Sequence, residues 1–134
     1  MKNILLLIMF ILCINAFGAE SPRVYSCRKC NISVIKIRRP NTLYCSAGGS
    51  HNWLDLGIAG KNIYHCRKCR KMVCTAKRPN VIYCPAGGSH NWDLLAQIGK
   101  NQYQCRKCNI KIAAHNKPSG MYCPAGGSHN WNKF

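Results

Sequence analysis

The sequence predicts a small, β-rich repeat protein in which three tandem β-hairpin modules each need a staple to stay folded. Three observations support this prediction. One set of residues recurs at an interval of 39 positions, as from Cys27 to Cys66 and from Cys66 to Cys105. Each copy contains three cysteines and one histidine at fixed spacing. Short apolar runs alternate with turns rich in proline and glycine, which is typical of short strands joined by tight loops.

The first 18 residues have the layout of a secretory signal peptide. Lys2 precedes an apolar run from Ile4 to Ile14, and small residues follow at Ala16 and Gly18. The run is shorter than the roughly 20 apolar residues of a membrane-spanning helix. We therefore expect residues 1–18 to be removed, and we expect a secreted protein without a transmembrane segment.

The repeats divide the rest of the chain into three modules. The letters "YCPAGGSHNW" occur at residues 83–92 and 122–131, and "YCSAGGSHNW" occurs at residues 44–53. We place module 1 at residues 24–56, module 2 at residues 63–95 and module 3 at residues 102–134. Residues 54–62 and 93–101 are expected to be linkers, and residues 93–99 are expected to form a short helical turn.

Each module is predicted to contain one β-hairpin. Residues 31–37 and 109–114 alternate partly between apolar and polar side chains, which favours a strand. The returning strands are expected in the runs "TLYC", "VIYC" and "GMYC" that end on the third cysteine of each copy. Between the two strands lie "RRPN", "KRPN" and "NKPS", in which proline suits the second position of a β-turn.

The cysteines and histidines follow the pattern C-x2-C-x14-C-x5-H in every module. Two thiolates separated by two residues can face one ion, and a second pair of ligands completes a tetrahedron, which is the arrangement of structural zinc sites. The pattern predicts three zinc ions, one per module. The expected ligands are Cys27, Cys30, Cys45 and His51; Cys66, Cys69, Cys84 and His90; and Cys105, Cys108, Cys123 and His129.

Disulfide bonds are the alternative staple, because secreted proteins fold in an oxidising compartment. Three cysteines per module cannot pair among themselves, and a disulfide scheme leaves the recurring histidine without a role. Cys74 lies outside the repeat, and its role is not assigned. A disulfide framework or a mixture with metal therefore stays open beside zinc. His65 and His115 also lie outside the repeat, and we expect both on the surface.

At these residues the modules resemble zinc ribbons, which place a "CRKC" knuckle, a β-hairpin and a second pair of ligands in this order. They are also similar to small secreted repeats that carry C-x2-C followed by "CPAGG" and a histidine. The resemblance implies a metal-stapled module as the unit of folding. It implies no particular activity.

The charge of the chain indicates the class of its partner. After loss of Lys2, 19 lysines and arginines face three acids, which leaves a net charge of +16. Such a charge favours polyanions: cell-envelope polymers, glycans of an extracellular matrix, extracellular nucleic acid or an anionic membrane surface. Four ligands close each metal site, and the sequence has no paired carboxylates or nucleophile motif. We therefore expect a binding protein that is not an enzyme, with antimicrobial defence as one setting.

Two other classes remain open, namely a structural protein of a matrix or coat and a lectin-like carbohydrate binder. For the three tryptophans, we favour a position in the core over the metal sites rather than contact with a ligand. We favour a core position even more strongly for the six tyrosines. The candidate ligand-binding residues are the knuckle and turn cations and one aromatic per module: Arg28, Lys29, Arg38, Arg39, Arg67, Lys68, Lys77, Arg78, Arg106, Lys107, Trp53, Trp92 and Trp131.

Overall fold

The chain is described by a computed structural model that covers residues 20–134. The expected signal peptide, residues 1–18, lies outside these residues. The described part is all-β, with the strands β1 (Arg23–Cys27), β2 (Ser33–Lys36), β3 (Trp53–Cys66), β4 (Met72–Thr75), β5 (Trp92–Cys105), β6 (Lys111–Ala114) and β7 (Trp131–Lys133). It has no helix that is long and apolar enough to cross a bilayer.

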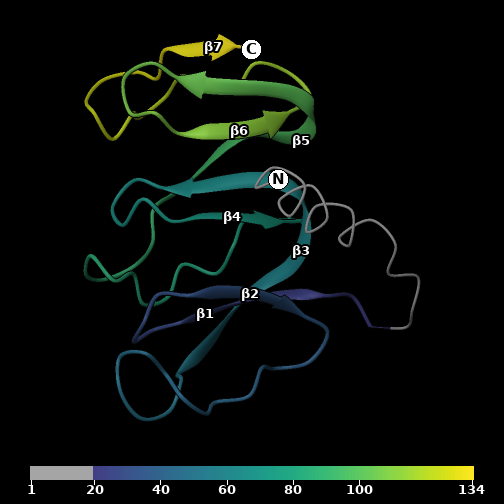
Figure 1. The fold of residues 1–134 in the computed structure, drawn as a ribbon, viewed down its shortest axis with the longest axis vertical. Helices are drawn as coiled ribbons and strands as arrows, with labels where there is room; N and C mark the ends of the chain where they lie inside the picture. Colours follow the sequence, from purple (N-terminus) through teal and green to yellow (C-terminus); the bar gives the residue numbers. More distant parts are fainter. Residues whose placement is uncertain (1–19) are drawn as a thin grey trace.

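The strands form one curled antiparallel sheet. Its order is β2-β1-β3-β5-β6, with β4 paired to β3 and β7 paired to β5. Figure 1 shows the three hairpins stacked along the long axis of the molecule, with β1 and β2 below, β3 and β4 between, and β5, β6 and β7 above. The order of the modules in the sequence is therefore their order in space.

The long strands β3 and β5 each belong to two modules. The first part of β3 pairs with β1, so that Trp53 lies opposite Cys27, and its last part pairs with β4 and β5, so that Cys66 lies opposite Trp92. The expectation of linkers at residues 54–62 and 93–101 was therefore wrong, and so was the helical turn at residues 93–99. Sheet pairing on both sides keeps these segments extended.

Each hairpin turns at the cysteine knuckle. The N–H of Cys27 donates to the carbonyl of Ile32 at 2.9 Å, and the N–H of Asn31 donates to the carbonyl of Cys27 at 2.9 Å. The strands that follow the knuckles, β2 and β6, lie within the predicted runs. The predicted returning strands were wrong, because "TLYC", "VIYC" and "GMYC" are loops in the structure. Their tyrosines have φ of 55° to 58°, which an extended strand does not accommodate.

Two glycines allow the hairpin of one module to cross the shared strand closely. A Cβ at Gly60 would lie 2.3 Å from the Cα of Ala76, and a Cβ at Gly99 would lie 2.2 Å from the backbone nitrogen of His115. The pairing with β4 and with β6 is interrupted by an irregularity beside each glycine. The glycines mark the points where one module passes into the next.

The core is divided into one cluster per module, each built around cysteines of the repeated pattern. In module 2, Val24 and Leu56 from module 1 are buried together with that module's own residues. In module 3, Ile63 and Leu95 from module 2 have the same position in the repeat. The cluster of module 1 consists of its own residues: Tyr25, Cys27, Cys45 and Trp53. Each module after the first is therefore covered by its predecessor.

Candidate metal centres

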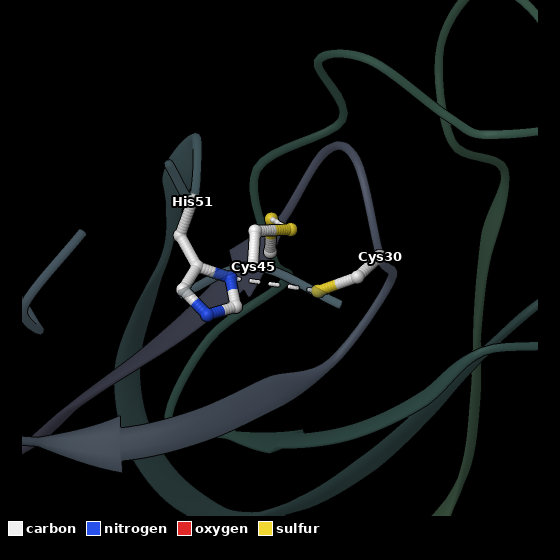
Figure 2. Close-up of side chains that lie close together, drawn as sticks. Cys30, Cys45 and His51 are labelled. Carbon is white, nitrogen blue, oxygen red and sulfur yellow. Dashed lines mark hydrogen bonds between the residues drawn. The ribbon is translucent and has the colours of Figure 1, made fainter. Parts of the chain in front are cut away.

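The twelve predicted ligands converge in three clusters of three cysteines and one histidine. In each cluster the four ligand atoms lie within 4.8 Å of one another, and each cluster could hold a metal ion. Figure 2 shows Cys30, Cys45 and His51 turned toward one another, with Cys30 on the knuckle between β1 and β2 and the other two on the loop before β3. The pairing of β1 with β3 brings the two pairs of ligands together, although they are far apart in the sequence.

The distances within the clusters fit the edges of a tetrahedron around a metal ion. The sulfurs of Cys27 and Cys45 are 3.9 Å apart, and the equivalent pairs are 4.0 Å and 3.9 Å apart. Metal–sulfur bonds of about 2.3 Å give a tetrahedral edge of about 3.8 Å. The Nδ1 of each histidine lies 3.5 Å from the second cysteine sulfur, against about 3.5 Å for an edge between sulfur and nitrogen.

These sulfur separations are much longer than a disulfide bond of about 2.05 Å. Among residues 20–134, no cysteine is joined to another by a disulfide. Cys74, on β4, is partly buried and packs against the core cluster of module 3, away from the four ligands of its own module. The described geometry is therefore one that could hold a metal ion in each of the three modules.

Backbone hydrogen bonds prepare one thiolate in each knuckle. Burial alone raises the pKa of Cys27, but hydrogen bonds from the backbone of Cys30 and Asn52 and from the side chain of His51 lower it to about 5. The same balance lowers the pKa of Cys105 to about 6. Burial and the neighbouring thiolates raise the pKa of Cys69 to about 12. A metal ion would therefore meet one charged sulfur and displace a proton from another.

The loop that carries the third cysteine and the histidine is held by the lysine of the knuckle. The Nζ of Lys29 donates to the carbonyl of Ser50 at 3.1 Å and also to the carbonyl of Gly48. Gly48 and Gly49 have φ of 93° and 64°, which glycine accommodates without strain. Lys68 and Lys107 bind the equivalent carbonyls. These lysines are also predicted ligand-binding residues and remain exposed, and in the structure each braces the loop of its own module.

A buried tryptophan stacks on the histidine of each cluster. The rings of His51 and Trp53 are stacked with centroids 4.6 Å apart, and the indole N–H of Trp53 donates to the carbonyl of Asn41 at 2.8 Å. The other two modules repeat both contacts. All three indoles are buried, which supports the core interpretation and removes Trp53, Trp92 and Trp131 from the surface that can meet a ligand.

The tyrosines fall into two groups. Tyr25, Tyr64 and Tyr103, two residues before the knuckle, are buried as expected. The other three are exposed, and arginines of a different module cover two of them. The guanidinium of Arg28 lies 3.4 Å from the ring centroid of Tyr83, and that of Arg67 lies 3.0 Å from the ring centroid of Tyr122. The expectation that all six are core residues was wrong for these three.

Two further residues between the modules were not identified from the sequence. Lys71 donates to the carbonyl of Asn31 at 2.9 Å and to the hydroxyls of Ser33 and Ser26, and so ties module 2 to the knuckle of module 1. His65 is buried, with its ring edge-on to that of His129 at 6.3 Å. The expectation of a surface position was therefore wrong for His65, because module 3 covers it. His115 is exposed, as expected.

The turn cations differ in their contacts. Arg39 donates to the carbonyl of Trp53 at 2.8 Å and holds the turn against the sheet. Arg38 lies 3.8 Å from Glu20 with most of its side chain exposed. Lys77 and Arg78 are exposed. Of the predicted ligand-binding cations, Arg28, Arg38, Lys77, Arg78 and Arg106 are thus exposed and not bound to main-chain carbonyls within residues 20–134.

Comparisons with models of known protein families, with curated proteins and with solved structures found no match. The description of the chain therefore rests on its three clusters of three cysteines and one histidine in an all-β fold, which is consistent with three metal-binding modules.

Proposed function

We propose that each cluster holds a zinc ion and that the zinc-stapled array is a secreted, non-enzymatic protein that binds polyanionic polymers. Zinc fits the donor set, because it takes four ligands in a tetrahedron and forms structural sites with three cysteines and one histidine. All four positions are filled by the protein, so no open position remains for a substrate. The proposed role of the metal is to hold the fold.

The observation that carries the binding proposal is the excess of cations that no acid neutralises. The three acids of residues 20–134 are each paired with an arginine: Glu20 with Arg38, Asp55 with Arg23 and Asp93 with Arg67. The remaining lysines and arginines carry the net charge of +16, or +13 once three zinc ions are bound by nine thiolates. A repeating cationic array can bind a long anionic polymer at several points. Because the modules are close together, binding by one module raises the effective concentration of the polymer at the next, which strengthens the overall binding.

The grooves between modules are the proposed contact points. One groove is lined by Arg67, Lys68 and Arg70 of module 2 and by residues 121–124 and 126–128 of module 3, among them Tyr122. A guanidinium stacked on a tyrosine ring keeps available those in-plane N–H groups that no acid binds, and these donors suit phosphate, sulfate or carboxylate. On Arg67, Nε and one terminal nitrogen already donate to Asp93, so the exposed Arg70 supplies a second guanidinium in this groove. Arg28 on Tyr83 provides the same arrangement between modules 1 and 2.

The test is the salt dependence of binding to defined polymers. Fluorescence anisotropy with labelled heparin and with a labelled DNA duplex should show tight binding at about 50 mM salt and a linear fall of log K with log salt concentration. The variant Arg28→Gln removes a guanidinium at a proposed contact point and should bind more weakly and with a smaller slope, whereas Arg28→Lys keeps the charge and should retain the slope of the original chain. Absence of binding at low salt, or binding that salt does not weaken, would contradict the proposal. The second result would favour a lectin-like binder.

A further inference from the structure

The contact between neighbouring modules is built twice in the chain from the same parts. The knuckle arginine of module 1, Arg28, covers Tyr83 of module 2, and the knuckle arginine of module 2, Arg67, covers Tyr122 of module 3. Both arginines and both tyrosines are separated by the 39 residues of the repeat. Each contact therefore consists of the knuckle arginine of one module and the loop tyrosine of the next module in the chain.

One half of this contact is exposed at each end of the array. Tyr44, the equivalent of the two covered tyrosines, is 92% exposed, against 51% for Tyr83 and 45% for Tyr122. Arg106, the equivalent of the two stacked arginines, is exposed and donates to Asn132 of its own module. Within residues 20–134, no arginine covers Tyr44 and no tyrosine lies under Arg106.

The apolar part of the contact is exposed at the ends in the same way. Leu56 and Leu95, which cover the cores of modules 2 and 3, are 1% and 3% exposed. Phe134 has the equivalent position in module 3 and is 60% exposed. At the opposite end, His51 is more exposed than its buried equivalents His90 and His129. The module 1 face (Tyr44, His51 and Ile32) and the module 3 face (Arg106 and Phe134) are thus both uncovered by residues 20–134.

We propose that these two faces bind each other between copies, so that the chain associates head to tail with a second copy of itself. Arg106 of one copy would cover Tyr44 of the next, and Phe134 would cover the module 1 core. The two faces differ, so this contact is heterologous, and a repeated heterologous contact builds an open filament unless it closes into a ring. The proposal goes beyond polyanion binding and does not depend on it.

The contact between copies is expected to be weaker than the contacts within a chain. Gln102 stands at the repeat position of the buried Val24 and Ile63, so the module 3 face is more polar than the internal ones. Two separate copies also lack a continuous strand in common, whereas neighbouring modules of one chain share β3 or β5. Copies that each carry a net charge of +16 also repel one another. Salt screens this repulsion over about 10 Å at 0.1 M, so added salt should strengthen self-association while it weakens binding to polyanions.

Sedimentation velocity on the purified zinc-loaded chain, without polyanion, tests the proposal. We expect the mean sedimentation coefficient to rise between about 10 µM and 1 mM protein, and to rise further at 0.5 M NaCl than at 0.1 M. A chain that stays monomeric over this range at both salt concentrations would overturn the proposal. Because polyanion binding is measured separately, at low salt and low protein concentration, the two proposals can fail independently.

Two variants identify the faces. Tyr44→Asn removes the ring and retains a residue that tolerates the positive φ of 58°, and Arg106→Ala removes the guanidinium. Each variant alone should associate at least 10-fold more weakly than the original chain, with its three ions retained as a check of folding. An equimolar mixture should form dimers and no longer species, because one intact face remains on each variant.

The matched control is Lys61→Ala, which removes one exposed cation outside both faces and should associate like the original chain. Self-association that neither Tyr44→Asn nor Arg106→Ala weakens would overturn the proposal. So would an equimolar mixture that contains no dimers.

Discussion

At the scale of single residues, the spacing of the ligands was informative and the spacing of the cations was not. All twelve predicted ligands meet in the clusters, because a tetrahedral site accepts few arrangements of three thiols and an imidazole. A lysine has no such constraint. Nothing in the sequence indicates that Lys29 reaches the carbonyls of a glycine loop 19 residues later. Tyr44, Tyr83 and Tyr122 were misjudged because their left-handed backbone turns them outward.

Loss of one ligand should show how the ions and the fold depend on each other. His90→Ala removes the Nδ1 that faces Cys69 and the ring that stacks on Trp92. We expect native mass spectrometry to find two ions per chain, and hydrogen exchange to speed up in β3 and β5, since both strands border module 2. His115→Ala, which removes an exposed histidine outside the clusters, should leave three ions and the original protection. Three ions in the His90→Ala chain would refute the assignment.

The backbone at the end of the middle knuckle predicts a stabilising substitution. Arg70 has φ of 62°, where the other two modules have Asn31 and Asn109 with φ of 62° and 61°. The left-handed conformation costs most residues about 1–2 kcal/mol, and asparagine adopts it more readily. Arg70→Asn should therefore raise the free energy of unfolding by about 0.5–1 kcal/mol, measured by thermal unfolding of the metal-loaded chain. Arg70→Ala removes the same side chain and should give no such gain; equal stability of the two variants would contradict the explanation.

At the scale of elements, the sequence predicted the β class and part of each hairpin but not the long strands. Alternation at residues 31–37 and 109–114 gave the strands after the knuckles. Residues 54–62 contain two glycines, which favour a loop when the sequence is considered alone. The strand β3 forms there because β1, β4 and β5 pair with it. These partners come from two modules, and no local pattern indicates them.

The crossing point between modules should be intolerant of any side chain. Gly99→Ala would place a Cβ 2.2 Å from the backbone nitrogen of His115, where β5 passes the end of β6. Relieving this contact requires the backbone to move, and overpacking of this kind typically costs about 1–3 kcal/mol. The melting temperature of the metal-loaded chain should fall accordingly. In Gly120→Ala the new Cβ would lie 3.8 Å from the nearest atom, an ordinary contact, so a fall of equal size in this control would argue against the steric cause.

At the scale of the whole molecule, the repeat predicted three modules but neither their order in space nor how they are joined. The period of 39 residues gave three equivalent units. The joints consist of the shared strands, of Lys71 on the knuckle of module 1 and of arginines on tyrosines. Lysine, arginine and tyrosine occur on most protein surfaces, so their presence does not distinguish a joint from free surface. The structure thus has three small cores in a row, each centred on a cluster of sulfur ligands.

The central claim is that three metal ions hold these cores together, and intact mass with thiol counting tests it most directly. Native mass spectrometry and elemental analysis of chain purified without reductant or chelator should find three zinc ions per chain. Thiol reagents should react with the ligand cysteines only after unfolding and chelation, because the metal protects them. A chain without metal, in which these cysteines are joined in disulfides, would contradict the account.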